Sequence, residues 1–334
     1  MDPVDAVRLT RSLVDIDSTT GREGDAGVWL AAFLRERGYQ VTEQPVTAGR
    51  FNVLARLPAD PVVVFSTHYD CVPPFFPSRI EGGLIFGRGS CDAKGIAAAQ
   101  IAAAERLRVS GESRFAMLFV VGEERGSDGA MVANAQAPAG VRFLINGEPT
   151  DNRLGAATRG MVRVRLRATG RAAHSSFPEL GESAIDKLLD ALMVVRGVVL
   201  PEDPLLGRTH YTVGLIEGGV APNVVSPSAA AELTFRIVGD AAAILDALNV
   251  VGGLVDLEPI LDVPAVRLHT VDGFETAVFP YTTDVPMLTA WGKPLLVGPG
   301  SIHVAHTAEE HLAIDELQHA VELYASLGRR LIAG

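Results

Sequence analysis

Cysteine, long apolar runs and runs of basic residues are scarce or absent in this sequence. The two cysteines are Cys71 and Cys91. As a nucleophile, Cys91 would need a general base and a group that orients that base, and the sequence supplies no such set beside it. No apolar run approaches the roughly 18–20 residues that span a bilayer. No basic stretch reaches five residues. Neither a membrane nor a nucleic acid is therefore expected as a partner.

The composition is that of an ordinary globular protein. Hydrophobic residues make up 48% of the 334 residues, charged residues make up 21%, and the net charge is −11. The length allows two domains, or one domain with a large insertion. The first twenty residues are polar and carry no signal-peptide pattern, so the cytoplasm is the expected compartment.

The most informative stretch runs from residue 62 to residue 95. It begins with three valines and a phenylalanine, which predict a strand buried on both faces of a parallel sheet. His68 and Asp70 follow, and two positions apart in an extended chain their side chains leave the same side. This pair suits a metal ligand and the acid that fixes its tautomer. A surface histidine and aspartate in a loop is the alternative.

Other acidic residues occur at comparable places. Glu123 and Glu124 follow a second apolar run, at 115–121, and Glu148 follows a third, at 141–145. Asp92 follows a glycine-bounded turn and precedes an alanine-rich helix predicted over 93–108. Because strand ends in open α/β sheets build sites, we expect these groups at one edge of the sheet. For Asp92 alone the alternative is a helix N-cap, and for each glutamate it is a solvated loop.

Five motifs occur in the order HYD, SCDAKG, GEERGSDG, NGEPT and AHTAEE. Together they resemble the M20 metallopeptidase/deacetylase family, whose members include acetylornithine deacetylase, succinyl-diaminopimelate desuccinylase and aminoacylase-type enzymes. The resemblance runs from about residue 5 to the predicted C-terminal helix.

The predicted fold class is α/β, with a mostly parallel sheet flanked by helices, as in zinc exopeptidases. Strand and helix patterns alternate to about residue 160 and return after 270, so the catalytic domain is expected over 1–160 and 270–334. Between them, 161–269 predicts an inserted α+β domain. Its first strand carries an arginine stripe, which is either a solvated face or a pairing edge. The resemblance implies that this insert is a lid through which the chain forms a homodimer.

The resemblance also implies a site for two divalent ions. Zn²⁺ is the first expectation and Co²⁺ or Mn²⁺ the alternatives, because imidazole and carboxylate donors suit all three. One ion would be held by His68 and Glu148 and the other by Glu124 and His306, with His303 as the alternative to His306. The resemblance also implies that Asp92 bridges the two ions, that Asp70 orients His68 and that Glu123 is the general base. Two such ions lower the pKa of a shared water and polarise the scissile carbonyl.

Three residues of the insert complete the predicted site. By the resemblance, His174 reaches the active site, often that of the partner subunit, to stabilise the tetrahedral oxyanion. Asn223 and Arg236 match the residues that bind the substrate carboxylate, for which a planar guanidinium is well suited. The alternative for His174 is an exposed histidine in a loop, and the alternative for Arg236 is a structural salt bridge.

The expected activity is removal of an acyl group, first of all acetyl, from the amine of a small amino acid such as an ornithine or lysine derivative. Within the family, the alternatives are a dipeptidase or carboxypeptidase and a succinyl-diaminopimelate desuccinylase. From another class, the alternative is a metal- or amino-acid-binding protein without catalysis.

Overall fold

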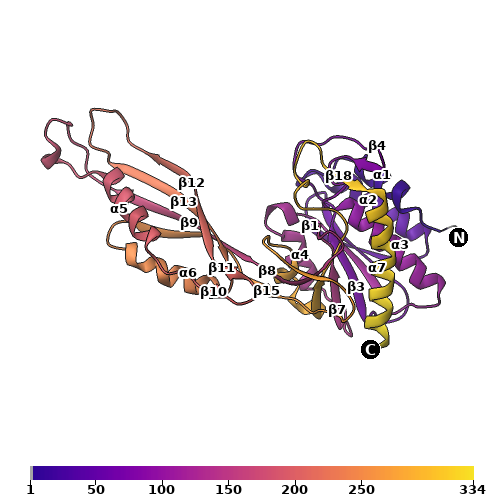
Figure 1. Cartoon of the computed structure of the whole chain (residues 1–334). Coiled ribbons are helices and arrows are strands. Elements are labelled where there is room, and N and C mark those ends of the chain that lie inside the picture. Colours follow the sequence, from indigo (N-terminus) through magenta and orange to yellow (C-terminus); the bar gives the residue numbers. More distant parts are fainter. Residues whose placement is uncertain (1–2) are drawn as a thin grey trace. The chain divides into compact units, whose positions relative to one another are not determined.

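The computed structural model describes residues 3–334, which divide into two compact units. Unit 1 comprises the chain up to Ala156 together with Leu268–Ala277 and Thr283–Gly334. Unit 2 comprises Ala157–Arg267 and the short segment Val278–Thr282. The main segment of unit 2 therefore spans 157–267, and the insert expected from the sequence spans 161–269. Each unit has its own hydrophobic core, and Figure 1 labels helices and strands of both units.

A six-stranded mixed sheet forms the centre of unit 1. Its order is β1-β2-β6-β3-β7-β17. The last four of these strands run parallel, and β1 and β2 are antiparallel at one edge. Strand β1 continues through Pro45, because an edge strand tolerates a missing N–H. The strands are β1 Gln40–Thr47, β2 Arg50–Arg56, β3 Val63–His68, β6 Phe115–Val120, β7 Phe143–Asn146 and β17 Lys293–Leu296.

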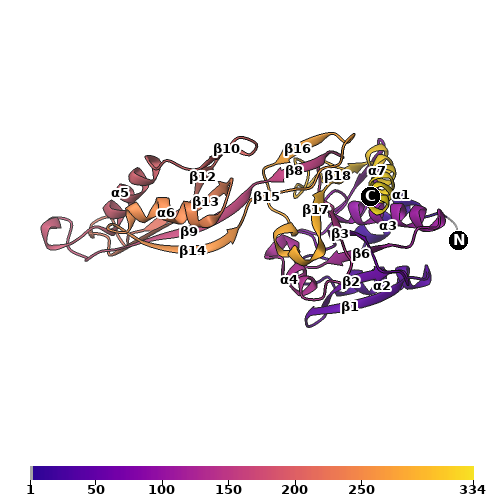
Figure 2. The same ribbon diagram turned by 90° about the horizontal axis from the view of Figure 1, so that it is seen from below.

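Helices cover both faces of this sheet, because its central strands are apolar on both sides. The residues of β3 and β6 are all buried. Phe65 of β3 belongs to the core cluster under one set of helices and Val64 to the cluster on the other face. Figure 2 shows the first set and, across the sheet, the short helix α4 Asp128–Asn134. The first set is α1 Ala6–Val14, α2 Gly24–Glu36, α3 Lys94–Val109 and α7 Ile314–Ala333.

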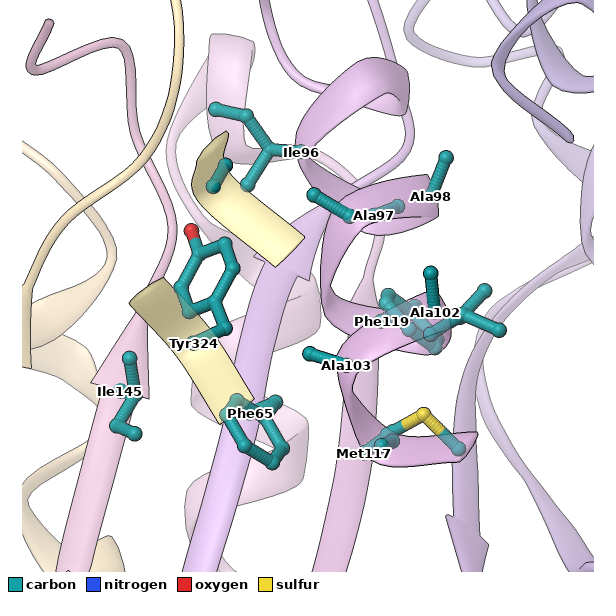
Figure 3. Packing of buried hydrophobic residues seen from close by; sticks show 14 of the residues in the cluster. Phe65, Ile96, Ala97, Ala98, Ala102, Ala103, Met117, Phe119, Ile145 and Tyr324 are labelled. Carbon is teal, nitrogen blue, oxygen red and sulfur yellow. The ribbon is translucent and has the colours of Figure 1, made fainter. Parts of the chain in front are cut away.

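Helix α3 packs closely on the sheet because most of its contact residues are alanines (Figure 3). The small side chains leave room for Tyr324 of α7, whose ring meets that of Phe65 edge-on at 6.0 Å. Truncating a buried aromatic residue such as Phe65 to alanine costs about 3–5 kcal/mol. This packing holds the carboxyl ends of β3, β6 and β7 in a fixed arrangement.

Unit 2 is an antiparallel sheet with helices on one face. The strand order is β12-β13-β9-β14, so the arginine-striped strand β9 is central and not a pairing edge. Its alternate residues from Val162 to Ala168 pack under the helices, and its arginines lie on the open face. The fourth strand of the sheet, 256–263, pairs with β9 at the edge opposite β12. The elements are β9 Gly160–Thr169, α5 Ala184–Arg196, β12 His210–Gly218, β13 Ser228–Ile237, α6 Ala241–Leu248 and β14 Asp256–Val263.

Short elements make up the rest of the described chain, and within residues 3–334 no helix is long and apolar enough to cross a membrane. The short strands are β4 Arg79–Glu81, β5 Leu84–Phe86, β8 Leu154–Thr158, β10 Glu202–Asp203, β11 Gly207–Arg208, β15 Val266–Arg267, β16 Thr276–Phe279 and β18 His311–Ala313. The 3₁₀ turns are η1 Glu123–Arg125, η2 Pro178–Leu180, η3 Asn249–Val251, η4 Val285–Met287 and η5 Thr289–Trp291.

Candidate metal centre

The polar groups predicted at the strand ends gather at one edge of the unit 1 sheet. His68 is the last residue of β3. Glu123 and Glu124 begin η1, after a left-handed Gly122 that turns the chain at the end of β6. Glu148 follows β7 by two residues. Since β6, β3 and β7 are adjacent parallel strands, their carboxyl ends meet at the same edge.

His68 is buried and presents one ring nitrogen to the centre. Its Nδ1 lies 3.0 Å from the backbone oxygen of Asp70 and 3.5 Å from the carboxylate Oδ1 of the same residue. Because a carbonyl only accepts, Nδ1 carries the proton, and Nε2 is left as the ligand atom. That Nε2 lies 2.9 Å from Asp92 Oδ1. The nearer orienting partner of His68 is therefore the main chain of Asp70, and the carboxylate lies further away.

The carboxylate of Asp70 has a second task, which the sequence patterns did not indicate. Its Oδ1 accepts the backbone N–H of Glu123 at 3.1 Å. Its Oδ2 accepts the backbone N–H of Glu124 at 3.3 Å and the hydroxyl of Thr20 at 2.9 Å. Asp70 is fully buried, so it ties the turn that carries the two glutamates to the end of β3.

Asp92 lies between two imidazoles, as a bridging carboxylate must. It does not cap α3, whose N-cap is Ala93 without a side-chain hydrogen bond. Its Oδ2 lies 3.2 Å from His306 Nε2, and the same nitrogen lies 2.9 Å from Glu124 Oε1. Donor atoms of His68, Asp92 and Glu124 all lie within 4.8 Å of one another. His303, the alternative to His306, is exposed.

The electrostatics of the cluster favour cations. Burial and then the charge of Glu148 raise the pKa of Glu123 well above its ordinary value, and burial likewise raises the pKa of Glu148. Although burial opposes it, hydrogen bonds from His306 and His68 lower the pKa of Asp92. Glu148 Oε1 is buried and has no hydrogen-bond partner within the described chain. Crowded carboxylates with a free buried oxygen, next to two imidazoles, fit Zn²⁺, Co²⁺ or Mn²⁺.

Glu310 is a further residue of this centre that the sequence patterns did not single out. Its Oε1 accepts three backbone N–H groups, from Gly89, Cys91 and Asp92, at 2.9, 3.2 and 3.1 Å. Its Oε2 accepts Arg88 Nη1 at 2.6 Å. The signal was present, because Glu310 is the last residue of the AHTAEE motif that supplies His306.

Asp284 is a second buried acidic residue that the sequence patterns did not single out. It is 1% exposed. Burial raises the pKa of Asp284 to about 7 against a hydrogen bond from Ser127, and the charges of Asp70 and Asp128 act in the same direction as burial. No apolar strand run precedes it in the sequence, so the strand-end pattern gave no signal for it.

The three predicted residues of the insert lie in unit 2. His174 is exposed in a loop, where its Nδ1 accepts the N–H of Ser176 at 3.1 Å. The backbone oxygen of Asn223 accepts the neighbouring N–H of Ser175 at 3.0 Å, so the two segments run together. Arg236 is half-buried and forms no ion pair with any described residue. The roles of these three residues stay predictions.

Both cysteines are buried and free. Burial raises the pKa of Cys71 to about 12 and raises that of Cys91 well above its ordinary value. Thiols of this kind are largely unreactive near neutral pH, in agreement with the expectation that Cys91 is no nucleophile.

Comparisons with known proteins agree with this geometry. A profile of Peptidase family M20/M25/M40 matches residues 64–330. A probable carboxypeptidase from Aspergillus terreus is 39% identical over 367 residues, covering 95% of this chain and 84% of the relative. The aminopeptidase PepT of Bacillus cereus has the same fold, with a TM-score of 0.82 at 20% identity over 99% of this chain and 100% of its own.

A second solved structure of the same fold is that of the YxeP protein of Bacillus subtilis, described as a dinuclear metal-binding peptidase. Its TM-score is 0.73 at 15% identity, over 98% of this chain and 97% of its own. These likenesses confirm the α/β fold. The Aspergillus relative is named a probable carboxypeptidase and not an acetylornithine deacetylase.

Proposed function

Because this chain belongs to peptidase family M20/M25/M40, we propose that it is a di-metal carboxypeptidase or dipeptidase that releases the C-terminal amino acid of a small peptide. As a member of this family, it is a metal-dependent hydrolase that acts on amide bonds. The observation that carries the proposal is the convergence of His68, Asp92 and Glu124, with His306 against the last two.

The ligand set supports two ions. His68 and Glu148 would hold one, Glu124 and His306 the other, and Asp92 has one oxygen towards each histidine. Zn²⁺ is our first candidate, and Co²⁺ or Mn²⁺ would accept the same donors. When bound, such ions supply Lewis acidity that lowers the pKa of water and polarises the scissile carbonyl.

Glu123 is the proposed general base. It takes a proton from the attacking water and returns it to the leaving amine. Both steps need a carboxyl whose pKa is raised towards neutrality, and burial together with the charge of Glu148 raises the pKa of Glu123. The N–H of Glu123 is held by Asp70, so the side chain starts from a fixed backbone. On the substrate side, Arg236 and Asn223 are proposed to bind the carboxylate, and His174 to stabilise the oxyanion.

Deacetylation of an N-acyl amino acid is the second candidate. The C-terminal motif from Gly298 to Leu312 resembles that branch of the family, and the amide cleaved again precedes an amino acid with a free carboxylate. A desuccinylase would use the same groups. The name of the Aspergillus relative favours the peptide substrate.

Hydrolysis by metal-free protein, with and without added Zn²⁺ or Co²⁺, tests the proposal on dipeptides, N-acetyl amino acids and N-succinyl-diaminopimelate. We expect metal-dependent release of the C-terminal amino acid from dipeptides. The Glu123→Gln variant should bind metal normally and lose about 10²–10⁴-fold in kcat. Faster hydrolysis of N-acetyl amino acids would select the deacetylase, and activity independent of metal would refute the mechanism.

We also propose a homodimer formed through unit 2. Ile185, Leu189 and Met193 follow one another at one-turn spacing on α5 and are 37, 51 and 64% exposed. Edge strand β12 adds the exposed pair Leu215 and Ile216. Exposed apolar patches and unpaired strand edges mark association surfaces. Light scattering should give a dimer mass for the wild type and a monomer mass for Leu189→Asp; a monomeric wild type would refute the dimer.

A further inference from the structure

The open face of the unit 2 sheet carries three arginines on β9, and they differ in what they contact. Arg165 is paired with Glu232 of β13. Arg167 Nε lies 2.8 Å from Glu258 Oε2 of β14. Arg163 forms no ion pair with any residue in the described part of the chain. Two of the three positive charges are thus neutralised by glutamates on the adjacent strands, and the third is not.

The register explains why Arg163 has no such partner. Directly opposite it lie Thr234 of β13 and Leu261 of β14, neither of which is charged. Arg236 lies opposite Met161, which makes it the diagonal neighbour of Arg163 on the same face. Diagonal neighbours on a sheet are about 7–8 Å apart at Cα, within reach of long side chains.

The other diagonal neighbour of Arg163 on β13 is Glu232, which is already paired with Arg165. On the side of β12, the groups beside the pair add no negative charge. His210 of β12 lies opposite Arg236. The guanidinium of Arg159 donates to His210 Nδ1 at 2.8 Å and to the backbone oxygen of Arg208 at 3.1 Å, so it meets no carboxylate there. Asp262, the next acidic residue on β14, lies opposite Val162, at the alternate position of the register.

Arg163 and Arg236 are both partly buried. Burial and then the charge of Arg163 lower the pKa of Arg236, so the two cations act on each other. Partly desolvated cations without a counter-ion destabilise the fold. An anion from outside the chain would offset both the desolvation of the two arginines and the repulsion between them.

We propose that Arg163 and Arg236 form a dicarboxylate-binding site, and that the amino acid released by this hydrolase is acidic, either aspartate or glutamate. The inference rests on the proposed function, in which Arg236 takes the α-carboxylate of the C-terminal residue. Arg163 then takes the side-chain carboxylate. Each planar guanidinium binds one carboxylate through two N–H groups, and two uncompensated charges match a dianion. Arg163 is therefore a specificity-determining residue.

The kinetic test compares Ala-Glu with Ala-Gln, which differ in one charge and have nearly the same shape. For the metal-loaded wild type we expect kcat/KM to be about 10- to 100-fold higher for Ala-Glu, the range typical of a hydrogen-bonded charge pair. In Arg163→Gln this ratio should fall to about one. Arg167→Gln, on the same strand and face but neutralised within the chain, is the matched control and should keep the wild-type ratio. A wild-type ratio near one, or a ratio unchanged in Arg163→Gln, overturns the inference.

A binding measurement separates this inference from the proposed function. Calorimetry with L-glutamate, L-glutamine and inorganic phosphate requires no hydrolysis. Glutamate should bind at least tenfold more tightly than glutamine or phosphate, and Arg163→Gln should remove the difference. If no peptide is cleaved but glutamate binds in this way, the site stands and the proposed function fails. Hydrolysis without any glutamate preference, or phosphate binding as tight as that of glutamate, refutes the dicarboxylate site.

Discussion

Glu310 Oε1 lies 3.1 Å from the backbone nitrogen of Asp92 and accepts its N–H. The same oxygen accepts the N–H groups of Gly89 and Cys91, so one carboxylate closes the loop that presents the central carboxylate of the candidate site. Glu310 comes from the motif that also supplies His306. Two ligand-bearing segments more than two hundred residues apart are thereby joined through a single buried side chain.

Glu310→Gln should keep the fold and loosen the site. The amide oxygen still accepts backbone N–H groups, but it is neutral and its hydrogen bonds are weaker than those of a carboxylate. We expect bound metal and kcat to fall together, as measured by elemental analysis and steady-state kinetics. Glu310→Ala should be worse, by about 3–5 kcal/mol in stability, because Arg88 is left buried without its partner.

The exposed neighbour Glu309 supplies the control for this experiment. Glu309→Gln changes the same chemistry one residue away, at a side chain that is 75% exposed, and should leave metal content and kcat unchanged. Wild-type metal affinity and kcat in Glu310→Gln would contradict the positioning role of Glu310.

Gly122 gives a second prediction, about the turn that carries the glutamate pair. It has φ +77°, and a Cβ there would lie 2.0 Å from Asp128 Oδ1 and 2.7 Å from Arg50 Nη2. Arg50 is held by Glu23 and Asp128 and cannot withdraw easily. Gly122→Ala should therefore displace Glu123 and Glu124 and lower kcat at least tenfold, measured at saturating metal.

Gly126 is the matched control for Gly122. It also has a left-handed φ, of +98°, but a Cβ there would meet nothing within 4 Å. Gly126→Ala should cost only the backbone strain of about 1–2 kcal/mol and leave kcat nearly unchanged. Equal losses of activity in the two variants would show that the turn tolerates no side chain for reasons other than the contact with Asp128.

Four of the proposed metal ligands could be predicted because each follows a local pattern. An apolar run of β-branched and aromatic residues predicts a buried strand, and a polar residue at its end predicts a position at the edge of the sheet. His68, Glu124 and Glu148 follow this rule, and Asp92 follows a glycine turn before an evident helix. His306 came from the motif resemblance, and the geometry places it against Asp92 and Glu124.

The roles of Glu310 and Asp284 could not be predicted, because they depend on contacts between distant segments. Nothing in the residues around Asp284 indicates that it is buried and close enough for its charge to act on Glu123. Strand β14 is hard to predict for a different reason, since it is an edge strand with mostly exposed residues and a proline, Pro259. Such a strand lacks both the continuous apolar run and a clear alternation.

A buried ion-pair cluster away from the site allows a prediction about pH. The carboxylate of Glu105 contacts Tyr39, Arg37 and Arg108 at 2.7, 2.9 and 2.8 Å. Although burial opposes it, hydrogen bonds from Arg108, Tyr39 and Arg37 lower the pKa of Glu105 below 4.5. A lowered folded-state pKa means that this stabilisation is complete above the unfolded pKa and is lost as the pH falls through the folded value.

Glu105→Gln should therefore be less stable than the wild type at pH 7, by about 1.5–3 kcal/mol for lost hydrogen bonds to charged groups. The difference should shrink below pH 4.5. Urea unfolding of metal-free protein between pH 3 and pH 7 measures both. A stability difference that stays constant over this range would show that Glu105 acts through packing rather than through its charge.

Glu148 allows a last prediction, in which one substitution has opposite effects with and without metal. Burial raises the pKa of Glu148 well above 4.5. A raised pKa of a carboxyl means that stability is lost as the pH rises from the unfolded value through the folded value. At pH 8 the metal-free protein is destabilised by the charge on buried Glu148. Glu148→Gln removes that charge, so the melting temperature of the metal-free variant should exceed that of the wild type.

With bound metal, the wild type should have the higher melting temperature of the two. A ligand that binds only the folded state stabilises it by about 2.7 kcal/mol at a hundred times its dissociation constant, and Glu148→Gln weakens that binding by removing one charged donor. Calorimetric scans with chelator and with excess Zn²⁺ measure both states, with the exposed Glu179→Gln as control. If Glu148→Gln lowered the melting temperature equally in both, Glu148 would be a structural residue rather than a ligand, because only a ligand makes the sign of the effect depend on metal.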